Sequence, residues 1–527
     1  MAVEYVSTRG KDPRSYRFSS AILSSTAADG GLLVPRTLPA LSQEEIVAMS
    51  NLPYHERAAR VIQKFDPDLP PGVLKRSTAE AYGRNFDDHR IAPLVPLPGT
   101  PNQHILELWH GPTSAFKDMA LQPMPRLFSV AAELNNNERL EKGEKQIHYL
   151  VLTATSGDTG KAAAEGYKDI PGVSILVYYP HGGVSRLQEL SMLTQEGNNV
   201  SMHPVKGNFD NAQTAVKQVF DDTEFAKQLD YLYNTVLSSA NSINWGRIAP
   251  QIAYHVSAYA DLVRNEVIKP GEKIDIAVPT GNFGNILAAY YAKQMGLPVG
   301  KLVCASNENN VITEFLHTGV YDIRNRKLQQ TSSPSMDILI ASNIERLLYL
   351  MTQDTQKVGR WMAELKERKV FEVDGETRQR LATEFYAGWI SDAEAAKNIK
   401  RVAMNAGYLM DTHTSVAQAV TEQYLQDESS SRPIVVCSTA NWAKFPVAVR
   451  NALVGGDMRN NATLNSNDEF EAVRAVKDIM GVKEPANIAA LADKPILHGL
   501  LYDATVQGVR ESVHAYLSSH DVNPKIR

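Results

Sequence analysis

The sequence predicts an α/β protein with two parallel or mixed sheets on either side of a cleft, preceded by an N-terminal cap and followed by a helical region. Apolar runs alternate with helical patterns from residue 147 onward, and this alternation is typical of βαβ units, whose strands are parallel. A second series of apolar runs begins at residue 274 and reaches residue 437. The length of 527 residues leaves room for roughly three to five domains.

The N-terminal part, residues 1–98, contains a predicted helix from Ser42 through Lys64 and ends in proline-rich turns. Ser42 and Glu45 have the spacing of a capping box, which marks the start of that helix. We expect these residues to form a cap domain.

The two α/β series define the remaining division of the chain. The first series has strands at 147–154 and 173–179 and helices that start at Gly160 and Ser185, and the second has strands at 274–278, 302–305 and 433–437. Two polar segments, 135–145 and 457–468, are predicted to be surface loops. We therefore assign 135–238 to a small α/β domain, 99–134 with 239–456 to a large α/β domain, and 457–527 to a helical C-terminal region.

Composition and charge indicate that small molecules are the partners. The 54 Lys and Arg against 59 Asp and Glu give a net charge of −5, with no large positive field for nucleic acid or an anionic membrane. No apolar run approaches the roughly 18 residues that span a bilayer. Cys304 and Cys437 are the only cysteines, so we expect a reduced protein of the cytoplasm. The sequence leaves the oligomeric state open between monomer and homodimer.

A glycine loop between a buried strand and a helix is the most informative local pattern. Gly281, Asn282, Phe283, Gly284 and Asn285 follow the strand at 274–278 and open a helix, where free N–H groups and the helix dipole favour an anion. The pattern predicts a phosphate cradle, although a turn without ligand fits the loop alone equally well. A near-copy starts at Gly207, but there Asp210 would cap the helix itself and repel a phosphate.

A second strand-to-helix junction runs from Thr153 to Ala163. Its hydroxyls and N–H groups crowd a helix start, which suits a carboxylate or another small oxyanion. Ordinary capping by Ser156 or Asp158 explains the same residues.

The third segment, His110 to Ala120, carries Lys117 directly after an aromatic residue among small and apolar neighbours. Desolvation there would lower the pKa of the amine and make it nucleophilic toward a carbonyl, although most lysines are solvated surface groups. Upstream, His104, Glu107 and His110 do not have the spacing of a zinc site, since Glu107 on a strand would face away from both histidines. We predict no metal.

A nucleophilic lysine, an oxyanion-binding helix start and a phosphate cradle on an α/β scaffold are the parts that hold pyridoxal 5′-phosphate and an amino acid. The chain resembles the threonine synthase family, of the tryptophan-synthase-like group (fold type II) of pyridoxal-phosphate enzymes, in the long form of fungi and many bacteria. The resemblance rests on ordered motifs along most of the chain, at residues 5–10, 29–32, 110–120, 156–160, 179–185, 241–247, 281–285 and 438–440.

The resemblance implies roles for individual residues. Lys117 would bind the cofactor covalently, Gly281, Asn282, Phe283, Gly284 and Asn285 would hold its phosphate, and Thr439 would contact its pyridine nitrogen. Thr155, Ser156 and Thr159 would bind the substrate α-carboxylate, and Asp158 would lie near the cofactor. Lys161, Arg247 and Lys444, which lie beside these motifs, are candidates for the substrate phosphate.

The implied reaction converts O-phospho-L-homoserine and water to L-threonine and phosphate, a lyase reaction and the last step of threonine biosynthesis. Three alternatives remain. They are another enzyme of the same group, such as a threonine dehydratase or cysteine synthase, a threonine-synthase-like phospholyase that stops after elimination, and a non-catalytic cofactor-binding or scaffold protein.

Overall fold

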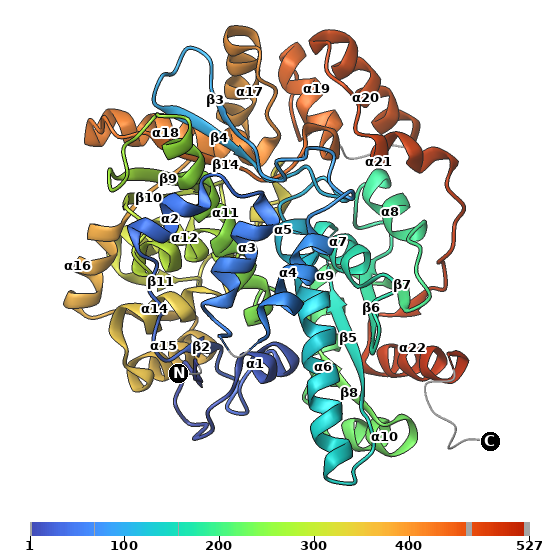
Figure 1. The fold of residues 1–527 in the computed structure, drawn as a ribbon. Helices are drawn as coiled ribbons and strands as arrows, with labels where there is room; N and C mark the ends of the chain where they lie inside the picture. Colours follow the sequence, from blue (N-terminus) through green and yellow to red (C-terminus); the bar gives the residue numbers. More distant parts are fainter. Residues whose placement is uncertain (1–2, 68, 156, 460–465, 521–527) are drawn as a thin grey trace.

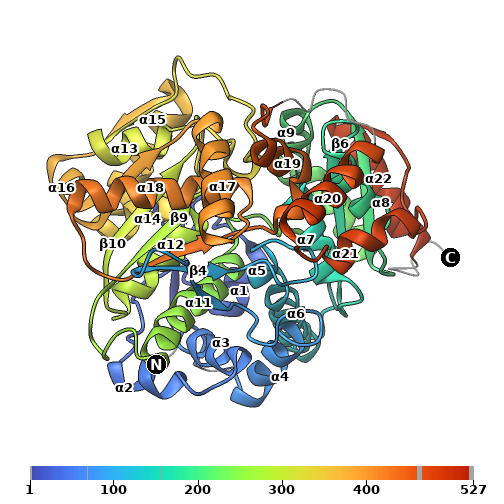
Figure 2. The same cartoon turned by 90° about the horizontal axis from the view of Figure 1, so that it is seen from above.

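The computed structural model describes residues 3–67, 69–155, 157–459 and 466–520. Two α/β units lie side by side, and the N-terminal helices pack beneath the larger one (Figures 1 and 2). This confirms the predicted α/β class with parallel and mixed sheets. Within the described ranges, no helix is long and apolar enough to cross a membrane.

The large unit is a six-stranded sheet in the order β13-β10-β9-β14-β4-β3. All neighbours pair in parallel except β3, which is antiparallel to β4. Its inner strands are buried along their length, which explains why they read as continuous apolar runs. The strands are β3 (Leu94–Pro96), β4 (Gln103–Glu107), β9 (Ile274–Pro279), β10 (Val299–Ser306), β13 (Phe385–Trp389) and β14 (Ile434–Ser438).

Helices cover both faces of this sheet. The central one, α11 (Trp245–Arg264), is buried from Trp245 through Leu262 and packs against α12 (Gly284–Gln294). The others are α5 (Asp118–Leu121), α6 (Pro123–Glu141), α13 (Val311–Thr318), α14 (Ile344–Thr352), α15 (Thr355–Arg368), α16 (Gly375–Glu384), α17 (Asp392–Ala406), α18 (Thr412–Glu428) and α19 (Pro446–Val454), with β11 (Val320–Asp322) and β12 (Val370–Glu372) as a separate antiparallel pair.

The small unit is a parallel five-stranded sheet in the order β15-β7-β6-β5-β8. Its edge strand β15 comes from the C-terminal region, which is therefore not purely helical and completes this sheet. The elements are β5 (His148–Ala154), α7 (Asp158–Tyr167), β6 (Val173–Pro180), α8 (Arg186–Leu193), β7 (Val200–Lys206), α9 (Phe209–Phe220), α10 (Thr223–Tyr233), β8 (Thr235–Ser238), α20 (Ser466–Met480), α21 (Ala486–Ala489), β15 (Tyr502–Asp503) and α22 (Val506–Ser519).

The N-terminal residues form short elements around α11. The predicted helix from Ser42 through Lys64 is wrong as one helix, because Pro53 caps a second helix and divides it. The capping box of Ser42 and Glu45 is confirmed. The elements are β1 (Tyr5–Ser7), α1 (Phe18–Ser24), β2 (Leu33–Pro35), α2 (Gln43–Met49), α3 (Tyr54–Gln63) and α4 (Pro71–Ala81).

The two predicted surface loops also differ. The segment 135–145 is helical as far as Glu141, because α6 continues beyond the core, so a domain boundary at 134/135 would fall inside a helix. In the segment 457–468, residues 460–465 lie outside the described residues, and α20 begins at Ser466.

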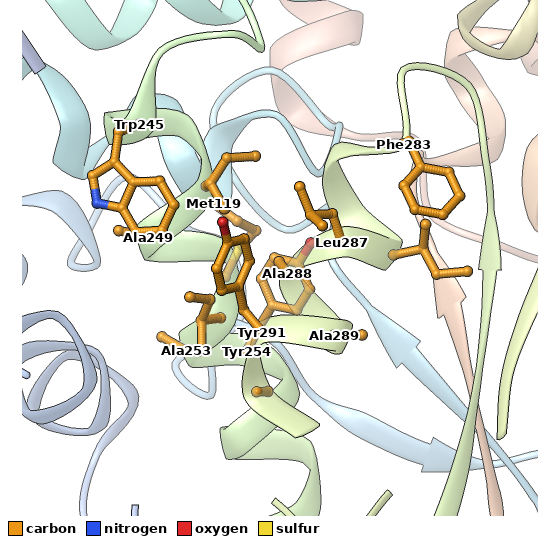
Figure 3. Packing of buried hydrophobic residues seen from close by; sticks show 14 of the residues in the cluster. Met119, Trp245, Ala249, Ala253, Tyr254, Phe283, Leu287, Ala288, Ala289 and Tyr291 are labelled. Carbon is orange, nitrogen blue, oxygen red and sulfur yellow. The ribbon is translucent and has the colours of Figure 1, made fainter. Parts of the chain in front are cut away.

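A buried hydrophobic cluster connects α5, α11 and α12 (Figure 3). Met119 lies two residues after Lys117 and packs in the same cluster as Trp245 of α11 and Tyr291 of α12. The segment that carries Lys117 and the helix that follows the glycine loop therefore share one core.

Candidate active site

Lys117 lies at the carboxyl end of the large sheet. Strand β4 ends at Glu107, and the chain then runs beside the end of β14, where the N–H of Phe116 donates to the carbonyl of Thr439 over 2.8 Å and Ala115 forms a bridge with Ala440. The predicted cofactor lysine and Thr439 are therefore brought together. Both side chains are buried.

The amine of Lys117 is surrounded by polar groups from separate segments. Its Nζ donates to Ser335 Oγ over 2.9 Å and pairs with Asp158 Oδ2 at 3.3 Å. It also lies 4.9 Å from the centre of the Phe116 ring. Burial lowers the pKa of Lys117 below its usual range, and although Asp158 opposes the shift, Lys444 and Arg247 add to it. A neutral, nucleophilic amine is therefore favoured.

Asp158, at the start of α7, is the contact from the small unit to this lysine. Its Oδ1 pairs with Lys444 at 2.9 Å and accepts from Gln188 Nε2 over 3.2 Å. Burial alone would raise the pKa of Asp158, but Lys444 and Lys117 hold it well below its usual range. The carboxylate therefore stays ionised beside these two lysines.

The glycine loop forms the predicted strand-to-helix junction between β9 and α12. Phe283 takes a left-handed conformation, with φ of 63°, and its ring is buried. A Cβ on Gly281 would lie 2.5 Å from the carbonyl oxygen of Ser335, so the loop passes directly against the segment that contacts Lys117. Ser335 therefore connects the lysine and the glycine loop.

Asn285 provides the test of whether this loop suits a phosphate. Its side chain is buried in the first turn of α12, and Oδ1 lies 3.1 Å from His255 Nε2. Its Nδ2 has no hydrogen-bond partner. A buried donor without an acceptor is costly, and a phosphate oxygen would satisfy it at the positive end of the helix dipole. The residues present fit the phosphate of pyridoxal phosphate.

The near-copy of this loop, which starts at Gly207, has a different cap from the predicted one. The side chain of Asn208, rather than that of Asp210, caps α9 by accepting from the N–H of Asn211. Asp210 is placed in the first turn and still adds negative charge there.

The predicted carboxylate-binding residues occupy the start of α7. Thr155 Oγ1 accepts from the N–H groups of Gly157 and Gly160 over 3.0 and 2.9 Å, so this hydroxyl caps the helix that we expected Ser156 or Asp158 to cap. Thr159 is half-buried in the first helical turn. Ser156 lies outside the described residues.

The three cation candidates have different surroundings. Lys161 contacts Glu165 and Gln195, and Lys444 pairs with Asp158. Arg247 is buried, donates from Nη1 to the carbonyl of Ala240, and forms no ion pair with any described carboxylate. Burial lowers the pKa of Arg247 to about 10. Its buried charge is the least compensated of the three.

Glu107 and His110 differ from the prediction. The chain turns after β4, so His110 Nε2 lies 3.0 Å from Glu107 Oε2, while Nδ1 lies 2.5 Å from Asp87 Oδ1. Burial alone would lower the pKa of His110, but these two carboxylates raise it to about 9. Among the described residues no group of three or more His, Cys, Asp or Glu is placed to hold a metal ion.

Two residues of the site were not predicted. Ser335 lies in a short 3-10 turn (Pro334–Met336), and its N–H donates to His413 Nε2 over 3.1 Å. Neither residue follows a strand or a glycine loop. A local sequence signal exists only near His413. It is the polar segment from Asp411 to Thr414, in which Asp411 caps α18 and orients His413.

Comparisons with known proteins match three family models to successive parts of the chain. The family described as "Threonine synthase N terminus" matches residues 4–82, "Pyridoxal-phosphate dependent enzyme" matches 86–440, and "Threonine synthase, C-terminal" matches 414–495. The chain is 38% identical to the threonine synthase of Saccharomyces cerevisiae over 86% of its own length and 89% of that protein. The chain belongs to the threonine synthase family. Its cofactor is pyridoxal 5′-phosphate, as in the pyridoxal-phosphate enzyme family that covers most of it.

Two further relatives show how far this family likeness extends. A pyridoxal-phosphate-bound threonine synthase from Brucella melitensis superposes with a TM-score of 0.82 at 34% identity, over 98% of this chain and 99% of that one. Threonine synthase-like 1 of Pongo abelii is 42% identical over 83% of this chain. The chain spans only 58% of the length of that relative.

Proposed function

We propose that this chain is a threonine synthase that converts O-phospho-L-homoserine and water to L-threonine and phosphate. The observation that carries the proposal is the buried amine of Lys117, with a lowered pKa, where the glycine loop, Thr439 and the start of α7 meet. Such an amine suits both covalent attachment to a carbonyl and proton transfer near neutral pH.

The cofactor would be held by residues on three elements. Lys117 is the proposed attachment point, residues 281–285 would hold the phosphate with the free Nδ2 of Asn285, and Thr439, which is bonded through its carbonyl to the Lys117 segment, would contact the pyridine nitrogen. When bound, pyridoxal phosphate supplies an electron sink that stabilises negative charge next to the substrate's amino group. The neutral hydroxyl of Thr439 leaves the ring nitrogen largely unprotonated, which favours elimination and replacement over transamination.

Lys117 would move the protons of the reaction. Its Nζ, when it is not attached to the cofactor, would take and return protons at Cα, Cβ and Cγ of the substrate, which requires a pKa near the working pH. Burial of the site keeps bulk water from competing for those protons. Asp158 holds Nζ by its carboxylate on the side that faces the small unit.

The substrate would be bound by its two anionic groups. Thr155, Ser156 and Thr159 are proposed for the α-carboxylate, because Thr155 and Thr159 lie at the N-terminus of α7 and Ser156 follows Thr155 in the sequence. For the departing phosphate, Arg247 is the preferred cation of the three candidates, since Lys161 and Lys444 already face carboxylates. We place those two lysines around the same group as secondary contributors.

The test is to incubate purified holoenzyme with O-phospho-L-homoserine and to measure threonine and phosphate together. We expect equal amounts of both, loss of turnover in Lys117→Ala, and borohydride-fixed cofactor on the peptide that contains Lys117. Phosphate with an oxoacid and ammonia, but without threonine, would identify a phospholyase instead. Label on another lysine would contradict the assignment of Lys117.

Two coarser matters belong to the same proposal. We place the protein in the cytoplasm, because Cys304 and Cys437 are both buried free thiols, and cell fractionation tests this. We also keep the four-part division of the chain, with β15 added to the small domain, and limited proteolysis of the holoenzyme would locate the boundaries. The oligomeric state stays open between monomer and homodimer, and analytical ultracentrifugation distinguishes them.

A further inference from the structure

The hydroxyl of Ser335 stands between the amine of Lys117 and the carboxylate of Asp158. Ser335 Oγ accepts from Lys117 Nζ over 2.9 Å and lies 3.3 Å from Asp158 Oδ2. The direct separation of Nζ from the same carboxylate oxygen is also 3.3 Å. The three groups form a triangle in which the shortest side joins the lysine to the serine.

The donors and acceptors of this triangle have one consistent arrangement. An ionised carboxylate only accepts, so the single proton of Ser335 points to Asp158, and the lone pairs of Oγ remain for Lys117. A carboxylate in close contact stabilises an ammonium ion, whereas a neutral hydroxyl does so much less. Ser335 thus offers the amine a partner that does not oppose loss of its proton.

The backbone holds Ser335 in this place from several sides. Its N–H donates to His413 Nε2, and His413 Nδ1 is in turn bonded to Asp411 over 2.9 Å. Its carbonyl oxygen lies against Gly281. The flanking loop is anchored by a cluster of polar side chains, Asn307, Asn309, Thr331, Ser333 and Asp337. The hydroxyl is positioned by the fold rather than by the lysine.

The other groups that face Lys117 act in both directions. Lys444 and Arg247 favour the neutral amine by repulsion, and burial acts the same way. Asp158 and the face of the Phe116 ring favour the ammonium ion. The equilibrium between the neutral amine and the ammonium ion therefore depends on how closely Nζ approaches Asp158. Ser335 contacts both groups and so can limit that approach.

We propose that Ser335 is a positioning residue for Lys117, because its hydroxyl accepts the hydrogen bond of Lys117 Nζ and keeps the amine from approaching Asp158 more closely than 3.3 Å. This rests on the proposed function. In each transfer the proton moves from the substrate carbon to Nζ and back, while Ser335 keeps its own proton on the side of Asp158. Without the hydroxyl, Nζ would approach the carboxylate and hold its proton more tightly.

The first test measures Lys117 itself and does not depend on turnover. Full-length protein freed of cofactor is labelled with acetic anhydride at a series of pH values, and mass spectrometry of the Lys117 peptide gives the midpoint at which the amine becomes reactive. Ser335→Ala should raise this midpoint by about one pH unit or more, a tenfold or larger gain in proton affinity. Ser335→Thr, which retains the hydroxyl, should stay near wild type.

Ser333→Ala is the matched control, because Ser333 Oγ accepts from Asn307 in the same loop and does not contact Lys117. It removes the same atom and weakens the loop, so it should lower the urea midpoint without raising the labelling midpoint. If Ser335→Ala does not fold, Ser335→Cys replaces it, since a thiol is a weak acceptor. An unchanged or lowered labelling midpoint in Ser335→Ala or Ser335→Cys would overturn the proposal. An equal rise of the labelling midpoint in Ser333→Ala would also overturn it.

The second test uses holoenzyme and the pH profile of kcat. The acid limb should move to higher pH in Ser335→Ala, so that activity lost at neutral pH returns in alkaline buffer, with KM little changed. A loss of kcat that is the same at every pH would refute the role of the hydroxyl. If no threonine forms in wild type, the proposed function fails, but the labelling midpoints still decide what Ser335 does to Lys117.

Discussion

Substitution of Gly281 by alanine tests whether the glycine loop binds the cofactor phosphate or is an ordinary strand-to-helix turn without a ligand. A Cβ at this position would lie 2.5 Å from the carbonyl oxygen of Ser335 and 3.2 Å from Cα of Met336, both of which are backbone atoms. The loop and the 3-10 turn must therefore move apart. Overpacking of this kind costs about 1–3 kcal/mol. If cofactor binding requires the loop to return to its wild-type position, this cost is subtracted from the binding free energy. The dissociation constant of the cofactor then rises by a factor of about 5 to 150.

Gly284→Ala is the matched control, three residues away in the same loop. Its added Cβ would meet no atom closer than 3.6 Å, at Asn343 Nδ2. Full-length variants freed of cofactor would be titrated with pyridoxal phosphate and followed by visible absorbance, with urea unfolding as a check on the fold. The reasoning is refuted if Gly281→Ala binds the cofactor within about twofold of wild type, or if Gly284→Ala weakens binding as much.

Three further changes test separate parts of the site. Gly284→Asp should weaken cofactor binding by about 1 kcal/mol or more, because it places a negative charge at the start of α12, and unchanged affinity in the same titration would contradict a phosphate site there. The pKa of His110 is raised to about 9, so its stabilising contribution is complete below about pH 6.5 and is lost as the pH rises through 9; it amounts to at most about 3 kcal/mol. Urea unfolding at pH 6 and pH 10 should show that loss in wild type and less of it in His110→Gln, and equal pH dependence would exclude the role of the imidazolium. Thr439→Asp should slow threonine formation and increase the pyridoxamine form of the cofactor, and wild-type rate and product ratio in that variant would show that Thr439 does not tune the ring.

Local patterns predicted the strands well and the ends of the helices less well. The runs at 274–278 and 433–437 are buried inner strands, so nearly every position is apolar and the pattern is unambiguous. The extension of α6 depends on contacts that no local pattern contains. Asn135 donates to the hydroxyl of Tyr149 and Asn136 to the carbonyl of Ile147, so two polar residues anchor a helix where composition indicated a loop.

The same distinction applies to the site. The glycine loop was predicted from its place between a strand and a helix, whereas Lys117 was predicted from its apolar neighbours and, like the place of Asp158 near the cofactor, from the family resemblance. Ser335 is separated from Lys117 by 218 positions and reaches it from a short turn with no periodic pattern. Contacts that are distant in the sequence, such as the hydrogen bond between Asn307 and Asp337 and that between Ser335 and His413, fix the position of that turn.

The distribution of charge around Lys117 is a physical argument for the proposed phosphorylated substrate. Two basic side chains, Lys444 and Arg247, and one carboxylate, Asp158, are the charged groups that act on Lys117. With Lys117 attached to the cofactor, Asp158 would keep its pair with Lys444 at 2.9 Å, and the buried Arg247 would still have no ion-pair partner among the described carboxylates. Buried charge without a counterion is costly, so an incoming phosphate is stabilised by the cations that its absence leaves uncompensated. The ion pair of Asp158 and Lys444 also connects the small unit to the large unit. The proposed substrate phosphate would therefore bind at the junction between the two units.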